Sequence, residues 1–150
     1  AMIMTQGHLI SDPPEKNEIE SLKREARGVL LKAFPDDVMG TLLAGTGGTV
    51  TTLAAMVHGI DVGAISPETM NGLLLKGDAL ETLRARMTRL TVSERAALPG
   101  LDRGRADVIL AGSLVVTEIL NFFHSSEMMV SLSDLLEGAL LDSLGVPLEI

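Results

Sequence analysis

The spacing of apolar residues between positions 15 and 33 predicts an amphipathic helix. Apolar side chains recur there every three or four positions, which places them on one helical face; they are Ile19, Leu22, Ala26, Val29, Leu30 and Ala33. The residues in front of this pattern are typical of a helix start, because Asp12 can cap the helix and Pro13 suits its first turn. We expect the helix to begin there and to end near Phe34.

Further helical patterns follow along the chain. Residues 66–90 carry apolar side chains at helical spacing and predict a single long helix. A capping box at residues 91–94 predicts a short helix that ends before Pro99. Residues 105–124 are apolar almost all round, which is typical of a helix buried in the core. Ser133 is expected to cap a last helix near the C-terminus.

Two short apolar runs without a helical period predict strands, at residues 38–44 and 128–131. Strands that alternate with helices favour parallel pairing, so we expect a helix-rich α/β fold with a small parallel sheet. The length of 150 residues suits one domain, residues 1–150. A sheet of two strands is thin, however, which indicates that the chain is part of something larger.

The composition excludes several classes of protein. The chain has no cysteine, which removes disulfide scaffolds and thiolate metal sites, and its three histidines show no metal-ligand spacing. Its formal net charge of -8 argues against binding to nucleic acid or to anionic membranes. The longest apolar stretch, residues 108–123, is interrupted by polar residues and predicts no membrane span. No signal-peptide pattern opens the chain, and we expect a cytoplasmic protein.

The candidate site is the glycine-rich turn Gly45-Thr46-Gly47-Gly48-Thr49, which joins the first predicted strand to a helix over residues 50–57. Backbone N–H groups at such a turn approach a ligand closely, and the helix dipole adds positive potential, so the turn favours an anion such as phosphate. It lacks the Lys-Ser/Thr pair of a Walker loop, and Val50 stands where a dinucleotide fingerprint has its third glycine. A tight strand-to-helix turn without a ligand is therefore an equally good interpretation.

The positive charge is concentrated in one part of this acidic chain. Residues 84–105 contain six of the twelve basic residues, all arginines, and only two acidic residues, Glu94 and Asp102. Such a segment can attract a polyanion. A solvated helix face with ion pairs is the simpler interpretation.

Several segments, taken in order, resemble the exopolyphosphatase and guanosine pentaphosphate phosphatase family. Residues 43–54, Leu-Ala-Gly-Thr-Gly-Gly-Thr-Val-Thr-Thr-Leu-Ala, are similar to that family's second glycine-rich loop and the helix after it. The other matches are Asp12-Pro13-Pro14, His58-Gly59, Glu94-Arg95, Pro99-Gly100-Leu101, Arg105-Ala106-Asp107 and Val130-Ser131. We expect Arg105 and Asp107 to pair and to anchor the buried helix that follows them.

The resemblance implies an actin-like, sugar-kinase-like architecture, in which two ribonuclease-H-like lobes hold phosphate between them. This chain resembles most of the second lobe only, a C-terminal fragment of a two-lobe phosphatase. The family hydrolyses terminal phosphoanhydride bonds of polyphosphate or guanosine pentaphosphate, usually with Mg²⁺. The catalytic residues would belong to the missing N-terminal lobe, so the resemblance implies none in this chain, and no metal bound by this chain alone.

On the same resemblance, Gly45, Thr46, Gly47, Gly48 and Thr49 are assigned to substrate-phosphate contact, in agreement with the chemistry of the turn. Residues 134–138 depart from the family's Gly-Leu-Arg-Glu-Gly run, which weakens any phosphate role there. A function of another class stays open: a non-catalytic domain that binds a phosphorylated ligand, or that self-associates as a homodimer through an unpaired sheet edge. Polyphosphate and a phosphorylated guanine nucleotide fit the sequence equally well as ligands.

Overall fold

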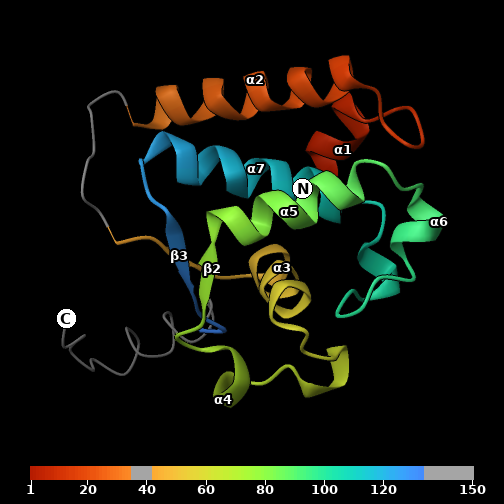
Figure 1. Ribbon diagram of the computed structural model, residues 1–150. Coiled ribbons are helices and arrows are strands. Elements are labelled where there is room, and N and C mark those ends of the chain that lie inside the picture. Colours follow the sequence, from red (N-terminus) through yellow and green to blue (C-terminus); the bar gives the residue numbers. More distant parts are fainter. Residues whose placement is uncertain (35–41, 134–150) are drawn as a thin grey trace, which may run out of the picture.

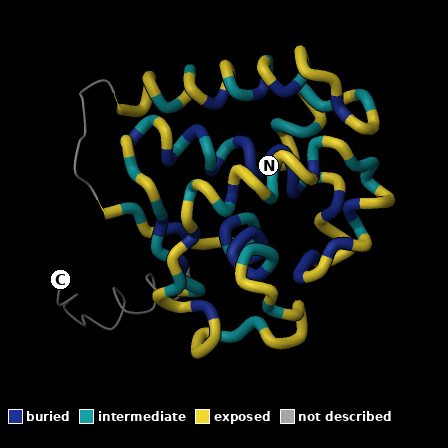
Figure 2. Tube along the Cα trace, in the orientation of Figure 1, coloured by how far each residue is buried: buried dark blue, intermediate teal, exposed yellow. Residues whose placement is uncertain are grey.

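Helix α7 (Ile109–Phe122) forms the centre of the fold in a computed structural model that describes residues 1–34 and 42–133. It packs against α2 (Lys16–Ala33), α3 (Gly48–His58) and α5 (Gly77–Met87), and Figure 1 shows α2 and α5 running alongside it. Nine of its fourteen residues are buried, and Figure 2 shows the buried positions gathering in α7 and α3. The prediction of a buried helix is confirmed, with a start four residues later than expected.

A small mixed sheet lies at one end of these helices. Strand β3 (Glu127–Val130) is central; it pairs in parallel with β1 (Ala44–Gly45) and antiparallel with β2 (Leu74–Lys76). The predicted parallel pair is therefore present, but the sheet as a whole is not parallel, because it has a third, antiparallel strand that the sequence patterns did not indicate. Residues 38–41 of the first predicted strand lie outside the described residues.

The third strand arises where one long helix was predicted. Instead of a helix over residues 66–90, the chain forms α4 (Pro67–Met70), then β2, then α5. Gly72 interrupts the helix because its φ of +83° is incompatible with a right-handed turn. The Gly72 N–H donates instead to the Val130 carbonyl at 2.9 Å, which brings the following residues into the sheet.

The helix start predicted at Asp12 is also wrong. Helix α2 begins at Lys16 with Glu15 as its N-cap residue. The Asp12 carboxylate instead accepts a hydrogen bond from the Val92 N–H at 2.8 Å and lies 3.6 Å from the Arg95 guanidinium. Arg95 is buried, and burial lowers the pKa of its guanidinium below the ordinary value. Asp12 thus stabilises a contact between positions about 80 residues apart.

The short helices complete the described residues. Helix α1 (Met2–His8) precedes α2, and the 3-10 turns η1 (Val62–Ala64) and η2 (Arg103–Arg105) lie in loops. Helix α6 (Val92–Arg95) has the predicted capping box, in which Thr91 and Glu94 each accept a hydrogen bond from the other's backbone N–H. The last predicted helix and residues 134–138 lie outside the described residues. In the part of the chain that the structure describes, every helix is too short or too polar to cross a bilayer.

Glu18 connects α1 to α2, and its carboxylate accepts backbone hydrogen bonds from Ile10 (3.0 Å), Ser11 (2.9 Å) and Glu15 (2.7 Å). The bond from Glu15 is the largest influence, and together these bonds lower the pKa of Glu18 below its ordinary 4.5, against an opposing effect of desolvation. Because the pKa is lowered on folding, this carboxylate stabilises the fold above the unfolded pKa. That stabilisation is lost as the pH falls through the folded pKa.

We expect Glu18→Gln to lower the melting temperature at neutral pH and to reduce the further fall on acidification, because the variant has no carboxylate to protonate. The measurement is the melting temperature of both proteins across the acidic range, from about pH 6 to pH 3. Glu25→Gln is the control, since Glu25 lies exposed on the same helix. Identical acid dependence in wild type and Glu18→Gln would contradict the assignment.

Candidate functional site

A pocket of about 430 Å³ opens at the end of β1 and the start of α3. This volume is within the range of small-molecule sites, about 300–1,000 Å³. Its lining comes from four parts of the chain: the glycine-rich turn with the first turns of α3, the apolar side chains of residues 62 and 65, the segment of residues 100–105, and residue 132. The pocket therefore lies where the sequence placed its candidate site.

The start of α3 leaves backbone donors at this pocket. Gly47 is the N-cap residue with a φ of +87°, and no side chain caps the helix. The first intrahelical bond runs from the Thr51 N–H to the Gly47 carbonyl, at 3.1 Å. The N–H groups ahead of Thr51 consequently have no partner within the helix, and the helix dipole adds positive potential at the same place.

The five predicted site residues have different positions. Thr46, Gly47 and Gly48 line the pocket. Gly45 is buried in β1, where its carbonyl accepts a hydrogen bond from the Ser131 N–H at 2.9 Å. The Thr49 side chain lies against Gly112 of α7, and a Cβ at position 112 would overlap it. Phosphate contact by these five residues stays a prediction, and the pocket geometry supports it for the three that line it.

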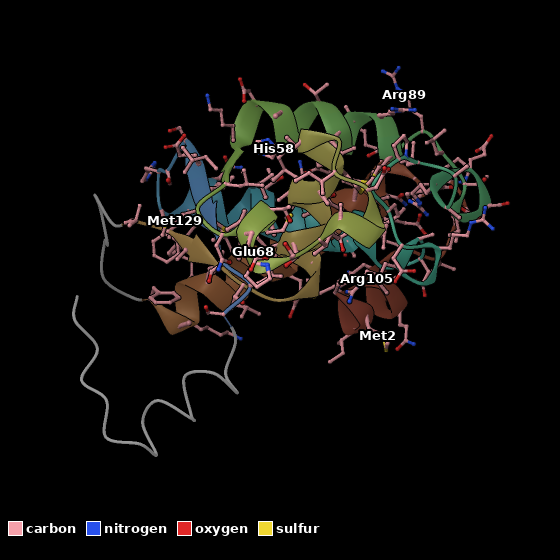
Figure 3. The ribbon with its side chains drawn as sticks, turned by 90° about the horizontal axis from the view of Figure 1, so that it is seen from below. Met2, His58, Glu68, Arg89, Arg105 and Met129 are labelled. Carbon is pink, nitrogen blue, oxygen red and sulfur yellow. The ribbon has the colours of Figure 1, made fainter. Side chains whose placement is uncertain are left out.

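Arg105 is the positively charged residue of the pocket lining, and the sequence did not assign it to the site. Its expected ion pair with Asp107 is not among those of the described residues, so that expectation is wrong. The guanidinium lies directly over Gly48 and lines the pocket, and a Cβ at position 48 would overlap its nitrogens. Figure 3 labels Arg105 in the view from below. The concentration of arginines in residues 84–105 pointed to this part of the chain, but it did not distinguish Arg105 from the other arginines.

The loop that carries Arg105 is held against α3. Gly100, with a φ of +74°, is buried and lies so close to α3 that an added Cβ would be 3.0 Å from the Cα and N of Met56. Asp102 then begins the turn η2, and its carboxylate accepts a hydrogen bond from the Gly104 N–H at 2.9 Å. The same helix thus supplies the free N–H groups and supports the loop that brings the guanidinium over them.

The pocket lining supplies one carboxylate, Asp102, toward a Mg²⁺ ion. Within residues 1–34 and 42–133, no three histidine or carboxylate side chains come together to hold a metal. One oxygen of the Asp102 carboxylate accepts the bond from the Gly104 N–H. Mg²⁺ is usually held by one or two carboxylates together with substrate phosphates. The Mg²⁺ that the resemblance implies is therefore an expectation for a complete enzyme, and no step proposed below passes through it.

Comparison with known proteins agrees with this architecture. Residues 1–146 match the model of the Ppx/GppA phosphatase family. The chain is 33% identical over 152 aligned residues to exopolyphosphatase 2 of Mycobacterium tuberculosis, an alignment that covers 95% of this chain and 46% of the relative. The chain thus spans about half the length of the curated relatives it matches.

Solved structures show the same correspondence. A PPX-GPPA enzyme of Aquifex aeolicus superposes with a TM-score of 0.84 at 26% identity, over 93% of this chain and 46% of that one. An exopolyphosphatase of Cytophaga hutchinsonii gives a TM-score of 0.77 at 26% identity, over 95% and 46%. The helix-rich α/β fold with its small mixed sheet therefore corresponds to about half of these actin-like structures. From the family match, the identity to the curated relatives and the shared fold, this chain belongs to the Ppx/GppA phosphatase family.

Proposed function

We propose that this chain is the second lobe of a two-lobe phosphatase that hydrolyses terminal phosphoanhydride bonds of inorganic polyphosphate or guanosine pentaphosphate. One observation carries the proposal: the Arg105 guanidinium and the uncapped N-terminus of α3 face the same pocket. The similarity to exopolyphosphatase 2, of which the chain covers 46%, supports both the reaction and the division into lobes.

In this proposal the lobe binds and orients phosphate. Phosphate oxygens accept hydrogen bonds from the N–H groups at Gly47 and Gly48, and the helix dipole favours their negative charge. Arg105 adds a planar guanidinium with several donors, which suits two oxygens of one phosphoryl group. Holding the phosphate chain in place lowers the entropic part of the barrier, while the residues that activate water belong to the other lobe.

The proposal is tested by adding polyphosphate to the ¹⁵N-labelled chain at constant ionic strength. We expect the amide signals of Thr46, Gly47 and Gly48 to shift, because these residues line the pocket. The signals of Gly59, at the other end of α3, and of Gly28, in α2, serve as the internal control, because neither residue lines the pocket. Shifts confined to residues outside the pocket would argue against phosphate binding at this site.

A second measurement tests the division of labour between the lobes. The purified chain is expected to release no phosphate from polyphosphate above a buffer control, since the proposal places the water-activating residues elsewhere. Release that survives further purification would place catalytic residues in this chain. The binding measurement and the hydrolysis measurement are independent, so either part of the proposal can fail alone.

A further inference from the structure

The segment that follows β3, residues 131–133, forms part of the pocket wall. Leu132 lines the pocket and is half-buried. Its neighbour Ser131 is held by strand pairing, because the Ser131 N–H donates to the Gly45 carbonyl at 2.9 Å. Gly45 is the last residue of β1, so the pairing with β1 holds the segment no further than this. The position of Leu132 therefore depends on other contacts.

Asn71 supplies one of these contacts from the other side of β3. The pairing of Leu74 with Met129 places Asn71, three residues earlier, opposite Leu132, three residues later. The backbone does not continue the antiparallel pairing there, because Asn71 is the C-cap residue of α4. The Leu132 N–H instead donates to the side-chain Oδ1 of Asn71, at 2.6 Å. The amide side chain thus replaces the carbonyl that a further strand residue would supply.

Thr46 holds the same segment from the glycine-rich turn. Its hydroxyl donates to the Ser133 carbonyl at 2.8 Å and so joins residues 87 positions apart. A threonine hydroxyl has one proton to donate. In this arrangement the side chain of Thr46 is used to hold the segment, and the backbone N–H is the donor that Thr46 can offer to an anion.

The glycine-rich turn has little else to fix its conformation. Gly47 has a φ of +87°, and an added Cβ there would have no neighbour within 4 Å, so packing does not restrain this residue. Glycine loses more conformational freedom on ordering than any other residue. An anion that had to order the turn itself would bind more weakly, whereas a turn already held at Thr46 avoids that entropic cost.

We propose that Thr46 and Asn71 are positioning residues, whose side chains hold residues 131–133 in the pocket wall and so fix the glycine-rich turn before an anion binds. Asn71 does not line the pocket, and the Thr46 hydroxyl is bonded to Ser133, so neither side chain needs to contact the anion. This inference rests on the proposed function, because anion affinity at the turn is the property that the positioning changes.

The test measures tripolyphosphate affinity by calorimetry at constant ionic strength, for wild type, Asn71→Ala and Thr46→Val. We expect each variant to bind about twofold to tenfold more weakly, because each loses one hydrogen bond that orders the pocket. Thr46→Ser, which keeps the hydroxyl, should recover most of the affinity. Recovery by serine would separate the role of the hydroxyl from the shape of the side chain.

Two matched variants control for the chemistry of these substitutions. Asn121→Ala removes an exposed asparagine of α7 that does not line the pocket. Thr82→Val removes a hydroxyl that donates to the Asp78 carbonyl on α5, also away from the pocket. Both controls should bind tripolyphosphate as wild type does, and thermal unfolding of every variant confirms that it is folded.

Amide hydrogen exchange shows whether the segment itself has been released. In Asn71→Ala the Leu132 N–H loses its acceptor and should exchange faster than in wild type. The Ser131 N–H is bonded to Gly45 and should stay protected in the same variant. A general loss of structure would instead accelerate exchange at both positions.

Unchanged affinity in Asn71→Ala would overturn the inference, whatever the exchange rate at Leu132. A loss of affinity confined to Thr46→Val would also overturn it, because the Thr46 hydroxyl would then act by direct contact with the anion. In both cases wild type still binds tripolyphosphate, so the proposed function survives. Failure of wild type to bind would contradict the proposed function and this inference together.

Discussion

Arg105→Ala is expected to weaken tripolyphosphate binding by about tenfold to a hundredfold, which is the largest effect on binding that the structure indicates. The guanidinium lies over Gly48 at the mouth of the uncapped helix, so its loss removes both charge and directed donors from the place where phosphate is held. Arg105→Lys should recover only part of the affinity, because an ammonium group cannot bind two oxygens in the plane of a guanidinium fork. Calorimetry with tripolyphosphate measures both variants.

Arg103→Ala separates this contact from a general effect of charge. Arg103 lies in the same turn η2 and is exposed, but it does not line the pocket. Its loss changes the net charge by the same amount and should alter affinity only weakly, through screened long-range attraction. If Arg103→Ala and Arg105→Ala weaken binding equally, the arginine-rich segment attracts the anion through its overall charge. The assignment of a specific phosphate contact to Arg105 is then wrong.

Gly100→Ala is expected to give the largest loss of stability, about 2–5 kcal/mol in the free energy of unfolding. Two costs combine in this estimate. A left-handed conformation costs a residue with a side chain about 1–2 kcal/mol, and forcing extra atoms into a packed region costs about 1–3 kcal/mol. The second cost applies because the new Cβ would be 3.0 Å from backbone atoms of Met56, which cannot rotate away. Urea unfolding with a linear extrapolation measures the difference.

Gly59→Ala provides the matched control for this prediction. Gly59 ends α3 with a φ of +68°, close to the +74° of Gly100, but an added Cβ would have no neighbour within 4 Å. We expect it to cost about 1–2 kcal/mol, from the backbone conformation alone. Similar losses of unfolding free energy for the two variants would show that the loop at residue 100 is not closely packed against α3.

These predictions concern one structural unit. Helix α3 presents its free N–H groups to the pocket, and the loop after Pro99 packs against the same helix through Gly100. A loop that moved away from α3 would also move Arg105 away from Gly48. Gly100→Ala should therefore weaken tripolyphosphate binding even under conditions where the variant stays folded.

Local patterns in the sequence were sufficient for most helices and for the place of the site. The apolar spacing of α2 and α7, the capping box of α6 and the glycine-rich turn before α3 were all identified, because each depends on residues within about four positions of one another. The turn was also interpreted as a place for an anion, since free N–H groups at a helix start follow from backbone geometry alone, and anion binding there stays a prediction.

The errors have a common origin in contacts between distant parts of the chain. The strand β2 was hidden in a helical pattern, because its pairing with β3 joins residues about 50 positions apart. Asp12 had the chemistry of a helix cap, but its partners are Val92 and Arg95. Arg105 was expected to pair with its near neighbour Asp107, and the packing of the loop on α3 directed it into the pocket instead.

The sequence by itself therefore predicted most of the helices and the glycine-rich turn, and an anion as the ligand that such a turn favours. Only the tertiary structure decided which side chains join that turn. It brought Arg105 over Gly48. The physical reason is that backbone hydrogen bonding acts over a few residues and leaves a periodic trace in the sequence. The direction of a charged side chain, by contrast, depends on how segments that are far apart in the sequence pack against one another.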